Sequence, residues 1–279
     1  MNTLKKILTA LTLSSLGFAY SSNATPIITS WDFIVDSAFT ASSYTDGTGT
    51  PTETNGNTLF GDAPTNLAWG NQVNQSSLDI GSGSNGNVSM NGLSNDVATE
   101  TSRLIHNNIS IPGGSSVLET ATLSTLLQLV PAGFGFPPAD LINALNFDIK
   151  FFETPNVGGM CGGVLCANDI FIISMPDGVV FDQGEGTLNE QFSIFEHTYN
   201  TELKLVSTQT GTGLSVLNDD ICDRVLDDHN GCIGLTTFEA QSNEFKVMMT
   251  ITHVPEPSTI LLLSLALFGI AVRMKNEHI

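Results

Sequence analysis

The chain has 279 residues and a formal net charge of −19, with 28 acidic residues against nine Lys and Arg. So few basic residues disfavour binding to nucleic acid or to an anionic membrane surface, because contacts with phosphate need Lys and Arg. The length allows one all-β domain or two small ones once terminal signals are set aside.

The first 24 residues have the pattern of a secretory signal peptide. Lys5 and Lys6 precede an apolar stretch that covers residues 7–19, and small residues follow at 22–24, where a signal peptidase acts. We therefore expect cleavage after Ala24, with Thr25 as the first residue of the mature protein. An N-terminal membrane helix is the alternative.

Alternating apolar and polar residues predict that the body, residues 25–253, is built from β-strands. Trp31, Phe33 and Val35 would share one face of a strand, and the same period of two occurs at 147–151 and 245–251. Clusters of Gly, Asn, Asp and Pro separate such segments. Many short strands joined by turns predict one secreted, antiparallel β-sandwich of jelly-roll or Ig-like type.

The body is strongly acidic. It keeps five basic and 26 acidic residues, for a net charge of about −21. Such acidity keeps an extracellular protein soluble through self-repulsion, and it also suits binding of Ca²⁺. Simple solubility is the favoured explanation, so we predict no cofactor, and calcium is the one alternative.

The densest group of acids lies in residues 218–232. The weak candidates for Ca²⁺ ligands there are Asp219, Asp220, Asp223, Asp227 and Asp228. The segment fails the EF-hand pattern, because with Gly231 at the sixth loop position the first and twelfth positions hold Leu226 and Thr237. A solvated acidic turn is the alternative.

The cysteines Cys161, Cys166, Cys222 and Cys232 predict disulfides in an exported chain. Two local bonds, 161–166 and 222–232, are the simplest pairing, and crossed pairs between the two regions are the alternative. The spacings fit a zinc site poorly, since zinc sites prefer two close C-x-x-C pairs.

No segment has the spacing of a catalytic motif. The four histidines of the body form neither H-E-x-x-H nor H-x-H, and the chain lacks G-x-S-x-G, a P-loop and a dinucleotide fingerprint. We therefore predict no catalytic residue and no enzyme activity. A hydrolase is the alternative, because its Asp and Glu pair would come from distant strands.

A carbohydrate-binding role would need aromatic side chains on an exposed face, where sugar rings stack on them. Trp and Tyr are scarce in the body, and Trp69 and Tyr199 are the candidates.

The last 26 residues, 254–279, have the pattern of a processed tail. Pro255 and Pro257 break the chain, a predicted membrane-spanning helix covers about 258–272, and Arg273 and Lys275 end it with basic charge. The apolar run is short, since 13 residues of helix span about 20 Å against a hydrocarbon core of about 30 Å. An unprocessed tail anchor is the alternative.

The tail resembles the PEP-CTERM sorting signal, in which the tripeptide Pro255-Glu256-Pro257 precedes an apolar helix and a basic stub. The resemblance implies processing by an exosortase-type membrane protease in a Gram-negative bacterium, often one that makes extracellular polysaccharide. It also implies an inner-membrane intermediate and a final position on the outer surface or outside the cell.

Segments of the body are similar to the THxN family of PEP-CTERM proteins. They are LAWGNQVNQSSLDI (67–80), LIHNNISI (104–111), FFETPN (151–156), DIFII (169–173) and GLTTFE (234–239). The naming motif falls at residues 105–108, where His106 and Asn108 match and Ile105 replaces the threonine. The resemblance implies a surface or matrix protein and supplies no catalytic residue.

The sequence thus predicts an exported protein of the cell surface or extracellular matrix, structural or adhesive in an exopolysaccharide or biofilm setting. Its processing partners would be signal peptidase and an exosortase-type protease, and exopolysaccharide would be a further partner. The main alternative is a carbohydrate-binding module for the cell's own polysaccharide, and a secreted hydrolase is less favoured.

Overall fold

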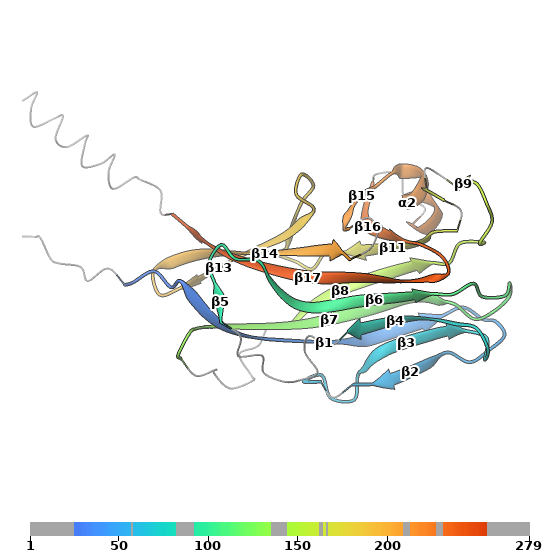
Figure 1. Cartoon of the computed structure of the whole chain (residues 1–279), viewed down its shortest axis with the longest axis horizontal. Helices are drawn as coiled ribbons and strands as arrows, with labels where there is room; N and C mark the ends of the chain where they lie inside the picture. Colours follow the sequence, from blue (N-terminus) through green and yellow to red (C-terminus); the bar gives the residue numbers. More distant parts are fainter. Residues whose placement is uncertain are drawn as a thin grey trace, which may run out of the picture.

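The computed structural model describes residues 25–56, 58–81, 92–134, 144–161, 164–165, 167–208, 213–226 and 231–255. Two antiparallel sheets pack face to face, so the predicted all-β sandwich is confirmed. Most strands run along the long axis of the molecule (Figure 1). The predicted signal peptide and C-terminal helix lie outside the described residues.

The first sheet has seven strands in the order β15-β16-β11-β8-β7-β1-β5. Their bounds are β1 Ser30–Tyr44, β5 Leu93–Ser94, β7 Leu118–Pro131, β8 Ala144–Phe152, β11 Asp169–Ser174, β15 Ser215–Leu217 and β16 Cys232–Thr237. The longest pairing joins β1 to β7, with Trp31 opposite Pro131 at one end and Tyr44 opposite Leu118 at the other.

The second sheet has eight strands in the order β12-β13-β14-β17-β6-β4-β3-β2. Their bounds are β2 Thr52–Asn55, β3 Pro64–Gly70, β4 Gln75–Gly81, β6 Thr99–Asn108, β12 Val180–Asp182, β13 Thr187–Ile194, β14 His197–Ser207 and β17 Gln241–Val254. The central strand β17 pairs with β14 and β6.

Three small elements complete the described structure. β9 (Met160–Cys161) and β10 (Val164–Leu165) form a two-stranded hairpin, and α2 covers Asp219–Leu226. Helix α2 and β9 lie at one end of the molecule, far from the end where β1 begins and β17 finishes (Figure 1). Within the described part of the chain, no helix has the length and apolar character needed to cross a membrane.

Alternation along each strand divides its side chains between the space between the sheets and the outer faces. In β11, Phe171 and Ile173 belong to the main core between the sheets, whereas Ile170 and Ile172 pack with α2 on the other face. The helix therefore covers apolar side chains that the first sheet would otherwise expose.

Candidate functional site

The apolar inner faces of four strands end in polar residues at the end of the sandwich near α2. In β8 the inner series Phe147, Ile149 and Phe151 leads to Glu153, one residue beyond the strand. In β11 the series begins with Asp169, two residues before Phe171.

The other two strands repeat this arrangement. In β16 the core residue Leu235 is followed at alternate positions by Thr237 and Glu239, and in β6 Leu104 is followed by His106 and Asn108. Antiparallel pairing of β8 with β11 and of β11 with β16 brings three of these ends together. The end of β6 joins them as the fourth, because β17 follows the turn after β16 and its first residue, Gln241, pairs with Asn108.

Glu153, Asp169 and Glu239, which we call the carboxylate cluster, converge at this point. Each offers an oxygen that lies within 4.8 Å of the oxygens of the other two. Asp169 is fully buried, and Glu153 and Glu239 are partly buried. Among the described residues this is the only group of three or more His, Cys, Asp or Glu side chains spaced to hold a metal ion.

Backbone and side-chain donors hold part of the cluster in place. The backbone N–H of Thr154 donates a 2.9 Å hydrogen bond to Asp169 Oδ1, and the indole N–H of Trp69 donates to Glu153 Oε2 at 3.4 Å. Asp169 Oδ2 and Glu153 Oε1 are buried and have no hydrogen-bond partner. The cluster therefore keeps free acceptor oxygens inside the protein.

Burial weakens the acidity of all three carboxyls. It raises the pKa of Glu153 to about 7, with the charge of Glu239 acting in the same direction and the hydrogen bond from Trp69 opposing it. Burial, with the charge of Glu153, raises the pKa of Asp169 well above its usual range. Burial also raises the pKa of Glu239.

His106 supports the cluster from the second sheet. Its ring stacks on Trp69 with centroids 5.6 Å apart, and its Nδ1 lies 2.8 Å from Thr237 Oγ1 in the first sheet. Burial lowers the pKa of His106 to about 3, so the ring is neutral at pH 7. The imidazole thus acts as a packed, uncharged link between the sheets.

The predicted calcium candidates lie elsewhere. Asp219 and Asp220 are exposed in the first turn of α2, where negative charge interacts favourably with the helix N-terminus. The Asn218 side chain caps this turn by accepting the N–H of Ile221. Asp223 is in the same helix, and Asp227 and Asp228 are outside the described residues. The expected acidic loop is therefore a helix over 219–226.

One predicted disulfide is confirmed. Cys222 at α2 and Cys232 in β16 are bonded, with their Cα atoms 5.7 Å apart, and this excludes the crossed pairings. The bond fastens α2 to the first sheet beside Ile170 and Ile172. Cys166 lies outside the described residues, so a bond between Cys161 and Cys166 stays a prediction.

The aromatic candidates for sugar binding were wrong. Trp69 and Tyr199 are both fully buried, Trp69 in the main core and Tyr199 against Trp31 in a second core. Neither ring has a face free to stack on a sugar. Period-two alternation already places Trp69 on the same face as the buried Leu67, a signal that favours the core.

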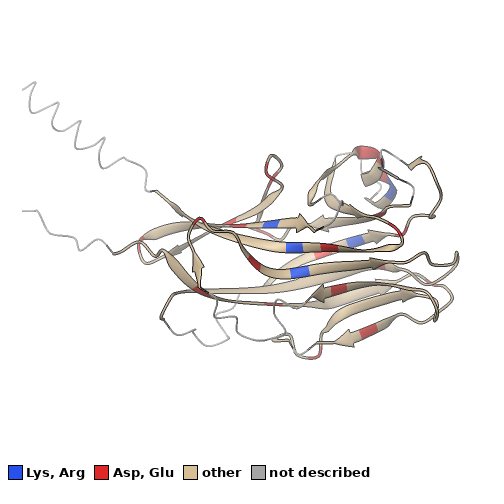
Figure 2. Ribbon diagram, in the orientation of Figure 1, with Lys and Arg blue, Asp and Glu red and all other residues tan. Residues whose placement is uncertain are grey.

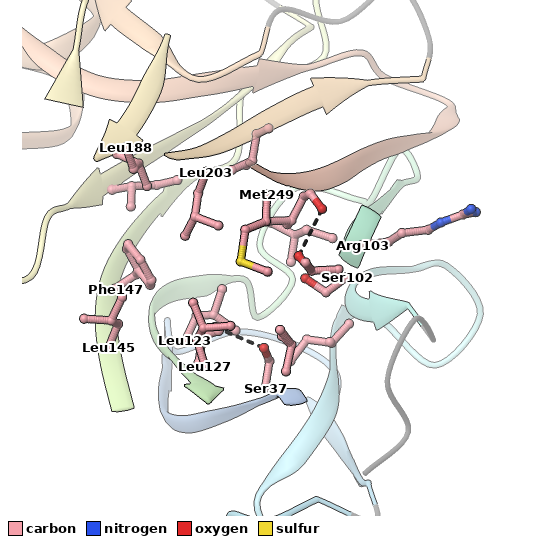
Figure 3. Close-up of a pocket in the computed structure, with 18 of the residues that line it drawn as sticks. Ser37, Ser102, Arg103, Leu123, Leu127, Leu145, Phe147, Leu188, Leu203 and Met249 are labelled. Atoms are coloured by element: carbon pink, nitrogen blue, oxygen red, sulfur yellow. Dashed lines mark hydrogen bonds between the residues drawn. The ribbon is translucent and has the colours of Figure 1, made fainter. Parts of the chain in front are cut away.

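A second feature between the sheets is an apolar cavity of about 90 Å³ near the middle of the sandwich. Figure 3 shows it between Leu123, Leu127 and Phe147 on one side and Leu203 and Met249 on the other. Hydrogen bonds such as the 3.0 Å contact between the hydroxyls of Ser37 and Thr125 satisfy polar groups at its wall. An apolar space of this kind stays dry.

The carboxylate cluster was missed in the sequence because its members lie far apart along the chain. A usable signal was present, since an inner-face series ends in an acid at 153, 169 and 239. All five segments that resemble the THxN family contribute to this place: they supply Trp69, His106 with Asn108, Glu153, Asp169, and Thr237 with Glu239.

The comparisons with known proteins concern the C-terminal end. Residues 253–275 match the family model of the PEP-CTERM protein-sorting motif, which confirms the predicted resemblance of the tail. A comparison with curated proteins found no match. The family model matches only the tail and does not extend into the body, so the similarity of the body to THxN proteins stays a prediction. The chain therefore carries a PEP-CTERM protein-sorting motif, the signal of exported proteins that an exosortase sorts through a membrane intermediate to the cell surface.

Proposed function

We propose that the mature protein is a non-catalytic structural or adhesive component of the cell surface or extracellular matrix of a Gram-negative bacterium. Its setting would be an exopolysaccharide or biofilm. The observation that carries the proposal is the position of the sorting motif, which begins at His253 where the sandwich finishes. Val254 is the last residue of β17 and pairs with Thr198, and Pro255 follows. A cut after Val254 would leave every described strand intact.

The two processing points lie at one pole of the molecule. His197 Nε2 donates a 2.6 Å hydrogen bond to the carbonyl oxygen of Thr25, and the neighbouring Thr198 pairs with Val254. The turn that carries Glu239 lies about 40 Å away, at the other end of the 14-residue strand β17, since each residue of a strand adds about 3.3 Å. A tethered intermediate would therefore hold α2 and the carboxylate cluster away from the membrane (Figure 1).

The distribution of charge suits an extracellular protein. In the described residues Lys and Arg occur on β6, β8, β14, β17 and α2, and acids occur along the whole sandwich (Figure 2). Arg103 and Lys246 are engaged by Glu100, and Arg103 also by Glu244. Net negative charge then keeps the molecules apart in solution.

The alternatives have weaker support. A carbohydrate-binding module would have to use aromatic residues other than the buried Trp69 and Tyr199. A hydrolase built on the carboxylate cluster would have to use Glu153 and Glu239 alone, because Asp169 is fully buried and out of reach of a polymer. We therefore place the function in presentation and retention of a stable sandwich at the surface.

The experiment is the intact mass of the protein recovered from its native host. We expect a mass that corresponds to residues from Thr25 to near Pro255, and extra mass at the new C-terminus would indicate covalent attachment. A chain with Glu256→Ala and Pro257→Ala should keep the tail, whereas the control Glu185→Ala, in an exposed turn, should be processed normally. A wild-type mass that still includes Ile279 would contradict the proposal.

A further inference from the structure

The carboxylate cluster has no compensating positive charge among the described residues. The groups that act on the pKa values of Glu153, Asp169 and Glu239 are burial, hydrogen-bond donors and the neighbouring carboxylates, with no Lys or Arg of the described chain among them. Three acids within 4.8 Å of one another repel each other strongly where water is largely excluded. Among the described residues, therefore, no cation balances the negative charge that these carboxyls carry when they are ionised.

Asn108 provides an independent observation. Its side chain is fully buried, and neither amide atom has a hydrogen-bond partner. It lies at the cluster, because contact with its side-chain amide lowers the pKa of Glu239, although this contact falls short of hydrogen-bond geometry. A buried amide without a partner of good geometry is costly, and a bound ion would supply that partner. The oxygen and nitrogen of the amide can exchange places, which lets Oδ1 face the cluster.

The chemistry of the donors selects the ion. Three carboxylates and one amide oxygen are the ligands of a hard cation. The carboxylate oxygens all lie within 4.8 Å of one another, so one ion with Ca–O distances of about 2.4 Å can reach all three. Magnesium prefers shorter bonds of about 2.0–2.1 Å in a strict octahedron. Zinc prefers nitrogen and sulfur ligands, and neither ring nitrogen of His106 belongs to the group.

We propose that Glu153, Asp169, Glu239 and the Asn108 amide oxygen bind a Ca²⁺ ion that joins the two sheets at this end of the sandwich. Asn108 ends β6 of the second sheet, whereas Glu153 follows β8 and Asp169 begins β11 in the first sheet. The ion replaces the repulsion of three acids by attraction to one centre. This site is distinct from the acidic helix α2.

The first test is a calcium titration of the chelator-treated full chain in detergent, followed by its melting temperature. A Kd of about 10⁻⁴–10⁻³ M is typical of extracellular calcium modules. Ca²⁺ at ten times Kd should then raise Tm by about 3–6 °C. Glu239→Gln and Glu153→Gln should abolish this rise. The matched control Asp219→Asn with Asp220→Asn removes two exposed acids and should keep it.

The second test uses Tb³⁺, which takes the place of Ca²⁺ and emits when a nearby indole is excited. Trp69 hydrogen-bonds to Glu153, whereas Trp31 belongs to another core with Tyr199. Trp69→Phe should therefore remove most of the sensitised emission and Trp31→Phe should retain it. Added Ca²⁺ should compete for the signal, and circular dichroism checks that each variant is folded.

Three outcomes would overturn the proposal. The first is a Tm that Ca²⁺ leaves unchanged. The second is an equal rise in the wild type and in Glu239→Gln, which would indicate general screening of the acidic surface. The third is a larger rise with Mg²⁺ or Zn²⁺ than with Ca²⁺ at equal concentration, which would assign another ion.

Discussion

The space between the sheets is filled in two different ways. Around His106 the side chains leave a gap of only about 10 Å³, lined by residues such as Leu78, Phe171 and Phe245. Near Leu203 and Met249 the sheets leave about 90 Å³ (Figure 3). Aromatic contacts explain the tight end. The Phe171 ring meets the His106 ring edge-on with centroids 4.9 Å apart, and it lies tilted against the Phe151 ring with centroids 4.7 Å apart.

The difference shows where side-chain packing is tightest in this sandwich. The tight end supports polar side chains whose geometry depends on fixed neighbours, whereas the hollow centre is lined mainly by aliphatic side chains that tolerate imperfect packing. Rigid packing beneath the carboxylate cluster is what a binding site requires.

The largest expected effect concerns the buried carboxyl of Glu153 at the tight end. In chelator, Glu153→Gln should stabilise the protein increasingly as pH rises from about 4.5 to about 7, because the folded-state pKa of Glu153 is about 7 and its ordinary value is 4.5. The folded wild type binds the extra proton in this window, so its stability falls as pH rises. The difference in free energy of unfolding between variant and wild type should grow by at most about 3 kcal/mol.

Urea unfolding at several pH values measures this difference. Asp169 and Glu239 also interact with Glu153, so only the difference between the two proteins reports on that carboxyl. Glu185→Gln in an exposed turn is the control and should show no such trend. A difference that is constant across the window would contradict the raised pKa.

The second effect has the opposite sign and belongs to His106. Burial lowers its folded-state pKa from 6.5 to about 3, so the unfolded state takes up the proton first and stability falls as pH drops below 6.5. Compared with His106→Asn, the wild type should lose about 2 kcal/mol of stability between pH 7 and pH 5. Equal pH dependence of the two proteins would show that His106 titrates normally when folded.

The third prediction contrasts the tight end and the central cavity directly, and its smaller change is the one at the cavity. Leu203→Phe extends into the central cavity and should raise the free energy of unfolding by about 0.5–1 kcal/mol. The same change at Leu78, which is fully buried at the tight end, should lower it by about 1–3 kcal/mol. Thermal or urea unfolding of the two variants measures this difference. Destabilisation of the same size at both sites would contradict the contrast between the cavity and the tight end.

The sequence by itself determined the features that depend on neighbouring residues. Alternation of side chains fixed the inner faces of strands such as β8 and β17, because a period of two follows from backbone geometry alone. The sorting motif at 253–275 and the local bond between Cys222 and Cys232 are likewise readable over short spans. The helix at 219–226 escaped prediction, because its acids suggested a loop although they also suit a helix N-terminus.

Only the tertiary structure decided what meets across the sheets. Glu153, Asp169, Glu239 and Asn108 come from four strand ends, and no spacing in the chain announces that they share one volume. Alternation places Trp69 on the face of Leu67, but which face of a strand is buried depends on the side that the second sheet covers, so the burial of Trp69 and Tyr199 was settled only by the fold. The order of the strands decides which of these residues come together. That order depends on the packing of both sheets as a whole, and no single segment of the sequence specifies it.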